Sequence, residues 1–210
     1  RLNRVPGALT IAGSDSGGGA GIQADLKTFS ALGVYGASVI TALTAQNTRG
    51  VHMVEAASPG IITAQIDAVT ADLAPAAIKL GMLGGSAAIR AVAAALADAS
   101  VPVILDPVMI AKSGDALLPD EAVETLRSVL LPRCALLTPN LPEAARLLDC
   151  PPARDEAEMA RQAEALRGLG AAAVLMKGGH AEGPTCTDLL LTETGILRFS
   201  AARQATRNTH

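Results

Sequence analysis

The sequence predicts a single α/β domain in which a mostly parallel sheet carries helices on both faces. Two observations support this prediction. Short apolar runs alternate with amphipathic, alanine-rich stretches along nearly the whole chain, which is typical of parallel strands joined by helical crossovers. The 210 residues suit one such domain with a sizeable buried core, and no repeat or linker divides them.

Strands are predicted where short apolar runs are bounded by turn residues or charged residues. A glycine-rich loop at 13–21 follows the first run, and a polar loop through 46–48 follows the second. The last two runs resemble a hairpin. In chain order, the predicted strands are 8–12, 34–43, 77–80, 101–105, 135–137, 172–176, 188–191 and 196–200.

Helices are predicted where apolar residues recur at helical spacing. Gly33 is a natural stop for the first helix, and Ser58 with Pro59 is typical of a helix start. Asp155 and Glu158 have the spacing of a capping box at the start of the last helix. In chain order, the predicted helices are 22–32, 59–73, 86–98, 120–130, 142–148 and 155–168.

The composition excludes two classes of binding protein. The chain has 17 Lys and Arg residues against 20 Asp and Glu, whereas a nucleic-acid-backbone binder needs clustered basic residues. Only 1% of the residues are aromatic, too few to stack single-stranded bases. A charged content of 18% with a mean hydropathy of +0.35 excludes general disorder. We therefore expect no nucleic-acid partner.

The sequence also favours a soluble, cytoplasmic protein with no membrane partner. Cys134, Cys150 and Cys186 are far apart, so neither a disulfide framework nor a zinc site is predicted. The N-terminal residues contain no apolar stretch long enough for a signal peptide. The uncharged run 28–48 is interrupted by glycine, serine and threonine, which favours a helix end, a turn and a strand over a membrane span.

Four loops that follow predicted strands are rich in functional residue types, and ligands of parallel sheets bind at that edge. The first is the glycine-rich loop 13–21, whose N–H groups and following helix N-terminus favour an anion. It matches neither G-x-G-x-x-G nor Walker A, and taken alone it is better explained as a tight turn. Asp25 can accept hydrogen bonds from an amino-substituted ring, or it can be a solvated first-turn acid.

The next two loops carry oxygen ligands. Asp106 stands between a buried strand and a proline, where it can hold Mg²⁺ or order a nucleophile, and where it can equally cap a turn. Asn140 and Glu143 follow the next strand, three residues apart at a helix start. That spacing suits a water-rich Mg²⁺ site, but it is also the spacing of ordinary helix capping.

The fourth loop starts at Lys177, which ends a strand and precedes Gly178 and Gly179. A lysine in this place can reach phosphate oxygens, and the glycines let a nucleotide lie close; the alternative is a surface lysine before a turn. Each of the four signals is modest alone, but all converge on one edge of the sheet. Together they predict Mg²⁺-dependent phosphoryl transfer, in which catalysis is mostly positioning and charge neutralisation.

The same residues resemble the hydroxymethylpyrimidine/phosphomethylpyrimidine kinase family of thiamine biosynthesis. The resemblance covers essentially the whole chain, and it implies a ribokinase-like three-layer fold. It also implies ATP-dependent phosphorylation of 4-amino-5-hydroxymethyl-2-methylpyrimidine and then of its monophosphate, with Mg²⁺, and it makes a homodimer plausible. The motifs that carry the resemblance are 8–15, 18–28, 41–51, 79–83, 111–114, 138–143 and 177–180.

On this resemblance one group of residues binds the pyrimidine substrate. Gln46 hydrogen-bonds the aminopyrimidine, and an amide suits this role because it both donates and accepts. Gly13 and Asp25 lie beside the ring. Met82 and Met109 pack on it, which suits a chain that is poor in aromatic residues.

A second group is implied to serve the nucleotide. Asp106 and Glu143 hold Mg²⁺, and Asp106 also belongs to the nucleotide site. Asn140 and Lys177 contact the ATP phosphates. Lys177 is therefore the expected catalytic residue of this chain, through stabilisation of the transferring phosphate.

The chain departs from the family pattern in two places. Family members often have proline where Ser16 stands and serine where Gly17 stands, which predicts a more flexible first loop. In the family, a Gly-Thr-Gly-Cys loop with the anion hole and the proposed cysteine base follows the segment that matches 207–210. That loop and the last helices lie beyond His210, so residues 1–210 are expected to form one kinase domain without them.

Two other functions stay open. One is a pyridoxal or pyridoxine kinase of the same fold, because substrate specificity overlaps in this branch. The other is a binding-only form that holds the pyrimidine without turnover. Sugar and nucleoside kinases are less favoured, because the first strand–helix–strand unit leaves no room for an inserted β lid.

Overall fold

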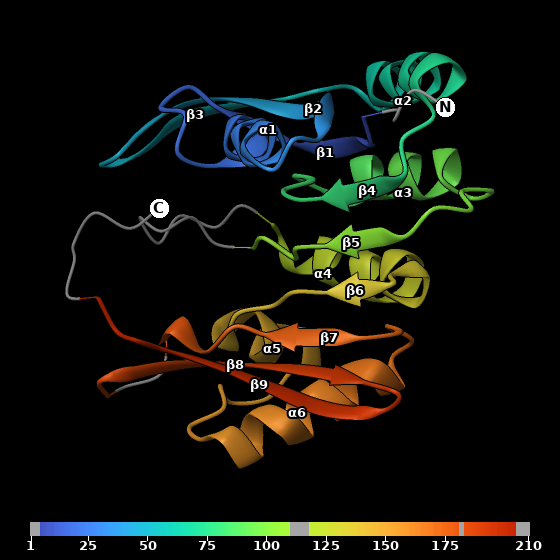
Figure 1. Cartoon of the computed structure of the whole chain (residues 1–210). Helices are drawn as coiled ribbons and strands as arrows, with labels where there is room; N and C mark the ends of the chain where they lie inside the picture. The colour runs from blue at the N-terminus through green and yellow to red at the C-terminus, as the bar shows by residue number, and fades with distance from the viewer. Residues whose placement is uncertain (1–4, 110–117, 181–182, 205–210) are drawn as a thin grey trace.

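The computed structural model describes residues 5–109, 118–180 and 183–204, and these form one nine-stranded sheet with helices packed against it (Figure 1). The strand order across the sheet is β3-β2-β1-β4-β5-β6-β7-β8-β9. The strands are β1 (Gly7–Asp15), β2 (Tyr35–Asn47), β3 (Gly50–Ala56), β4 (Ala77–Leu80), β5 (Val103–Leu105), β6 (Leu136–Leu137), β7 (Val174–Met176), β8 (Thr185–Thr192) and β9 (Gly195–Ala202). The helices are α1 (Gly21–Ala31), α2 (Pro59–Leu73), α3 (Ser86–Ala95), α4 (Asp120–Thr125), α5 (Leu141–Leu148) and α6 (Glu156–Gly168).

The six central strands, β2, β1, β4, β5, β6 and β7, run parallel, and β3, β8 and β9 are added antiparallel at the two ends of the sheet. This confirms the predicted α/β class and the predicted hairpin at the end of the chain. Because the central strands share one direction, their carboxyl ends meet at one edge. The loops that follow β1, β4, β5, β6 and β7 therefore lie along that edge.

The helix starts follow the local signals in the sequence. The Ser58 side chain caps α2, and Pro59 occupies the first helical position, as predicted. At α6 the Asp155 carboxylate accepts a hydrogen bond from the N–H of Glu158 at 2.8 Å. The Glu158 carboxylate accepts from the N–H of Arg154 instead of closing the box on Asp155. The predicted capping box is therefore half formed.

The structure corrects the sequence prediction around the second strand. Residues 46–48 were predicted as a polar loop, but β2 extends to Asn47 and pairs with β3, so only a tight turn separates the two strands. The sequence pattern misses β3 because none of its residues is buried, which removes the alternation that marks a half-buried strand. A smaller difference is that the stretch 120–130 changes from α to π geometry at Leu126.

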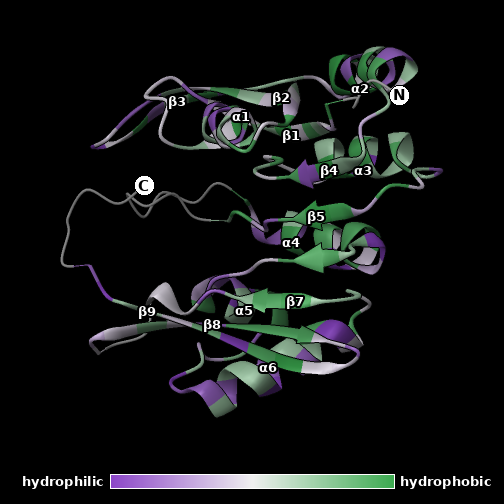
Figure 2. Ribbon diagram, in the orientation of Figure 1, coloured by the Kyte–Doolittle hydropathy of each residue, from purple (hydrophilic) through white to green (hydrophobic). Residues whose placement is uncertain are grey.

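The core lies on one face of the central sheet. Val103, Leu105 and Val174 are buried on the face that packs against α3, α4, α5 and α6, and alternate residues such as Ile104 and Leu175 point to the other face. Figure 2 shows β5, β6 and β7 as hydrophobic strands. Helix α1 packs on β1 and β2 from the second face, where the Asp25 carboxylate reaches across to β4. No helix in the described part of the chain is long and apolar enough to cross a membrane.

Candidate active site

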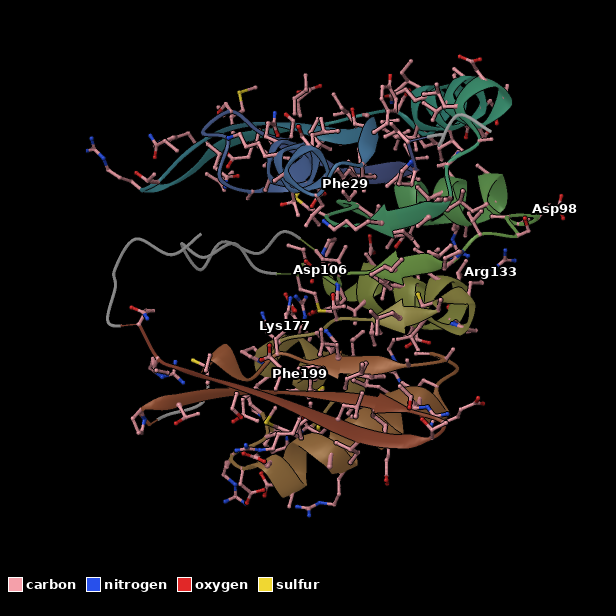
Figure 3. All side chains as sticks on the ribbon, viewed as in Figure 1. Phe29, Asp98, Asp106, Arg133, Lys177 and Phe199 are labelled. Carbon is pink, nitrogen blue, oxygen red and sulfur yellow. The ribbon has the colours of Figure 1, made fainter. Side chains whose placement is uncertain are left out.

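Side chains from the ends of β5 and β7 meet at the carboxyl edge of the sheet. Lys177 Nζ lies 2.9 Å from Asp106 Oδ1 and 4.0 Å from Glu143 Oε2. The hydroxyl of Thr138 donates to the same Asp106 oxygen at 3.4 Å. Figure 3 shows Asp106 and Lys177 together at this edge, with Asp98 and Arg133 at the opposite edge. The structure thus brings together three of the residues that the sequence singled out for phosphate and metal binding.

Asn140 joins this cluster through the start of α5. Its side-chain oxygen accepts a hydrogen bond from the N–H of Glu143 at 2.9 Å, and the Glu143 carboxylate accepts from the N–H of Asn140 at 2.8 Å. Ordinary helix capping therefore describes this pair correctly. The cap also fixes the Glu143 carboxylate within ion-pair reach of Lys177.

The Glu143 carboxyl group has a raised pKa. It is only 7% exposed, and burial raises its pKa to about 7. The N–H of Asn140 and the charge of Lys177 oppose that rise, whereas the charge of Asp106 adds to it. Near neutral pH the carboxyl group is therefore poised between its two forms, and an added cation favours the ionised form.

The turn that presents Lys177 is held from both sides. The N–H of Lys177 donates to the carbonyl of Pro139 at 2.9 Å, and the N–H of Gly178 donates to Asp188 Oδ1 at 2.8 Å. A Cβ atom at Gly178 would overlap the carbonyl oxygen of Thr187, so this position accepts only glycine. These contacts fix the backbone from which the lysine side chain extends.

The glycine-rich loop differs from the expected anion cradle. The buried carboxylate of Asp15 accepts hydrogen bonds from the N–H groups of Gly17, Gly19 and Ala20 at 2.8, 2.9 and 2.8 Å. An acid of the chain itself therefore occupies the donors that an anionic ligand would use. The sequence reasoning missed Asp15, although an aspartate directly before a glycine run is a recognisable turn signal.

Of the residues expected around a pyrimidine, Gly13, Gln46 and Met82 lie at the ends of β1, β2 and β4, whereas Asp25 is in α1 and Met109 follows β5. The N–H of Gly13 donates to the carbonyl of Met82 at 3.1 Å, and a Cβ atom at Gly13 would stand 2.8 Å from the methionine methyl group. Gln46 lies near the end of β2, with its Oε1 3.3 Å from the Thr44 hydroxyl. Met109 is fully buried. The roles of these residues as ring contacts stay predictions.

Asp25 has partners that the sequence reasoning did not foresee. Its Oδ2 accepts hydrogen bonds from the Thr10 hydroxyl at 2.6 Å and from Lys79 Nζ at 2.9 Å. The two charged side chains are only 17% and 24% exposed, so Asp25 is a partly buried ion-pair partner and not a solvated acid. A usable signal was present, because a lysine inside the short apolar strand 77–80 requires a buried partner.

Two cavities lie away from this edge. One of about 240 Å³ is formed between Leu96, Val103 and Arg133 at the amino end of β5. Another of about 650 Å³ lies beside α6, between Cys150 and Arg161. Neither is lined by the residues singled out for chemistry.

The cluster has the donor set that Mg²⁺ requires. Among the described residues, Asp106 Oδ2 and Glu143 Oε1 accept no hydrogen bond, so each carboxylate keeps one oxygen for a cation. No three acidic, histidine or cysteine side chains gather into a closed metal cage in the described ranges. Two carboxylate oxygens completed by water and phosphate oxygens match the way proteins usually bind Mg²⁺.

A lysine next to two carboxylates, at the carboxyl ends of parallel strands, is suited to neutralise and position phosphate groups. The fold and the site thus define the class of the protein as an α/β phosphotransferase.

Comparison with known proteins identifies the family. The family model for phosphomethylpyrimidine kinase matches residues 15–210. The chain is 58% identical to the hydroxymethylpyrimidine/phosphomethylpyrimidine kinase of Rhizobium meliloti (strain 1021), over 97% of this chain and 76% of the relative. It is 56% identical to the enzyme of the same name from Escherichia coli (strain K12), over 97% of this chain and 77% of the relative. The chain belongs to the phosphomethylpyrimidine kinase family.

Solved structures agree with the ribokinase-like fold. The phosphomethylpyrimidine kinase of Clostridium difficile 630 superposes with a TM-score of 0.86 at 46% identity, covering 92% of this chain and 84% of that chain. The pyridoxal kinase of Staphylococcus aureus, solved in complex with pyridoxal, gives a TM-score of 0.89 at 28% identity, covering 99% of this chain and 76% of that chain. The predicted enzyme class, a kinase that uses ATP, is confirmed by this membership.

Proposed function

We propose that this protein phosphorylates 4-amino-5-hydroxymethyl-2-methylpyrimidine with ATP, and then phosphorylates the resulting monophosphate, in thiamine biosynthesis. The single observation that carries this proposal is the contact of Lys177 Nζ with Asp106 at 2.9 Å and with Glu143 at 4.0 Å, in a chain of this family. In the first reaction the γ-phosphoryl group moves to the hydroxymethyl oxygen. The bond from the γ-phosphorus to the β,γ-bridging oxygen of ATP breaks, a bond from this phosphorus to the hydroxymethyl oxygen forms, ADP leaves with the bridging oxygen, and the hydroxyl proton passes to water.

Lys177 is the residue of this chain that stabilises the transferring phosphate. Its ammonium group carries three N–H donors, of which the Asp106 contact uses one. The nucleotide phosphates then take the remaining donors, and Asn140 adds an amide beside them. Fixed donors of this kind stabilise developing charge without reorganising during the reaction.

Asp106 and Glu143 hold Mg²⁺ in this proposal, through the carboxylate oxygens that accept no hydrogen bond in the described part of the chain. When bound, the cation neutralises phosphate charge and orients the transferring group. The chain's own contribution is to fix the two carboxylates, because the α5 cap holds one of them and Thr138 with Lys177 holds the other.

The pyrimidine lies between the ends of β1, β2 and β4 in this proposal. Gln46 pairs with the ring through its amide, and Gly13 and Asp25 lie beside the ring. Met82 packs against the ring, and Met109, which is fully buried in this structure, reaches the ring only if its side chain moves. The contact between Gly13 and Met82 supports this arrangement, because a side chain at position 13 would collide with the methionine.

A second candidate function is phosphorylation of pyridoxal. The observation that favours it is the likeness to the Staphylococcus aureus pyridoxal kinase, with a TM-score of 0.89. Both substrates are hydroxymethyl-substituted aromatic rings with a ring nitrogen, so one set of ring-binding residues can suit either. The proposal also extends to a cytoplasmic location, which the cysteine usage favours, and to a homodimer, which rests on family resemblance alone.

The test is ADP release by the purified protein with Mg²⁺-ATP and each ring compound in parallel. We expect kcat/KM for the hydroxymethylpyrimidine to exceed that for pyridoxal at least tenfold, and the diphosphate to be the end product. The reverse order of kcat/KM would favour the pyridoxal kinase. Calorimetric binding of the pyrimidine without any ADP release would instead identify a binding-only form.

A further inference from the structure

Ser16 makes an unusual connection to the strand end that carries Gln46. Strand β1 ends at Asp15, whose partner in β2 is Thr44. The next residue, Ser16, donates its hydroxyl proton to the carbonyl of Gln46 at 2.7 Å and accepts a hydrogen bond from the N–H of Gln46 at 2.8 Å. One hydroxyl therefore satisfies both backbone groups of one residue and replaces the next rung of the β1–β2 ladder.

Gln46 depends on this connection because the strand pairing is irregular around it. On the other side of β2, Ala45 pairs with Met53 but Gln46 pairs with Val51, so the β2–β3 register shifts between the two residues. Irregularities of this kind re-aim a side chain. The N–H and C=O groups of Gln46 point to the β1 side of β2, past the end of the β1–β2 ladder, where they need partners other than a strand. Ser16 supplies those partners.

Ser16 is itself held by the glycine-rich loop. The Asp15 carboxylate binds three N–H groups of that loop, as described above, and a Cβ atom at Gly17 would lie 3.2 Å from the Cα atom of Asn47. The loop therefore packs directly on the end of β2. Ser16 and Gly17 were expected to make this loop more flexible. The Ser16 hydroxyl instead makes two hydrogen bonds that hold the loop against the end of β2.

We propose that Ser16 is a positioning residue for Gln46: its hydroxyl fixes the backbone from which the Gln46 amide reaches the pyrimidine ring. This proposal rests on the proposed function, in which Gln46 recognises the ring. Ser16 acts through Gln46 and does not itself need to contact the substrate. Its loss therefore weakens ring binding while the phosphate-binding residues at β5 and β7 are left in place.

The test compares the variants Ser16→Ala, Ser16→Thr, Gln46→Ala and the double variant Ser16→Ala/Gln46→Ala. We expect Ser16→Ala to raise KM for the pyrimidine about three- to tenfold, the range expected for exposed hydrogen bonds, with kcat and KM for ATP within about twofold. Ser16→Thr keeps the hydroxyl and should restore KM to within about twofold of the parent. Ser128→Ala is the matched control, since its hydroxyl bonds to a carbonyl far from the site.

The double variant separates positioning from a general structural role. If Ser16 acts through the Gln46 amide, Ser16→Ala should change KM less than about twofold once Gln46 is alanine. An equal increase in both backgrounds would overturn the proposal. If Ser16→Ala leaves KM unchanged while Gln46→Ala raises it, the Ser16 proposal is also overturned. Ring recognition by Gln46 would then still hold. An unchanged KM in Gln46→Ala would overturn the ring-recognition assignment itself and the Ser16 proposal with it.

Discussion

Lys177 and Asp106 are 71 residues apart in the sequence, yet the lysine Nζ lies 2.9 Å from the aspartate Oδ1. The contact exists because β5 and β7 are parallel and both end at the same edge of the sheet, with β6 between them. In the proposed function this ion pair joins the phosphate-binding lysine to a metal-binding acid, and it fixes both side chains before the substrates bind. On that proposal, the lysine exchanges part of this contact for phosphate oxygens when a nucleotide binds.

Replacing Lys177 with methionine should therefore lower kcat strongly. We expect a loss of at least about 100-fold, as found when one preorganised donor to a developing charge is removed, with KM for the pyrimidine changed less than about threefold. Steady-state kinetics with both substrates measures this. Arg90→Ala, which removes an exposed positive charge on α3, is the control. A loss of tenfold or less would contradict the phosphate role of Lys177.

The Mg²⁺ assignment makes a separate prediction for Asp106. In Asp106→Asn the side chain keeps its size and one oxygen but loses the charge that a hard cation prefers. We expect the Mg²⁺ concentration for half-maximal activity to rise at least about tenfold, with a partial recovery of kcat at high Mg²⁺. The measurement is a Mg²⁺ titration of initial rates at saturating ATP. An unchanged midpoint of the Mg²⁺ titration would contradict the assignment of Asp106 as a Mg²⁺ ligand.

The sequence alone could predict this cluster because strand direction determines it. Once 101–105, 135–137 and 172–176 are recognised as parallel strands, the residues that follow them must share an edge. This rule alone places four residues at the edge: Asp106, Asn140, Glu143 and Lys177. The contacts among the four side chains could not be predicted from strand direction, because the α5 cap and the lysine compete for the same Glu143 carboxylate.

Other contacts depend on register, which the sequence pattern does not determine. Lys79 meets Asp25 only because Thr10 and Lys79 are paired across β1 and β4, and α1 then places its acid over that pair. Ser16 meets Gln46 only because β1 ends at Asp15, so that the Ser16 side chain and not its backbone faces the end of β2. Strand β3 lacked a signal altogether, because an exposed edge strand shows no alternation of buried and exposed residues.

The Lys177 turn makes a prediction about stability that is independent of activity. A Cβ atom at Gly178 would overlap the Thr187 carbonyl oxygen, whereas a Cβ atom at the neighbouring Gly179 meets nothing within 4 Å. Gly178→Ala should therefore lower the free energy of unfolding by roughly 2 kcal/mol or more, as overpacking does, and Gly179→Ala should change it by less than about 1 kcal/mol. Chemical denaturation of both variants measures the difference. Equal effects would mean that β8 shifts to make room.

The raised pKa of Glu143 predicts how stability changes with pH. Burial raises this pKa from an ordinary value of 4.5 to about 7, so the folded protein holds a proton that the unfolded chain releases. The stability associated with that proton is fully present below pH 4.5 and is lost as the pH rises through 7, by on the order of 3 kcal/mol. Glu143→Gln carries no titrating proton and can still accept from the N–H of Asn140, so it should lack this loss. The stability of the variant relative to the parent should therefore increase between pH 4.5 and pH 8, as measured by urea denaturation. Ser128→Ala removes no titratable group, so its free energy of unfolding should differ from that of the parent by the same amount at both pH values. A Glu143→Gln difference that stays constant across this range would show that the carboxyl group ionises normally in the folded protein.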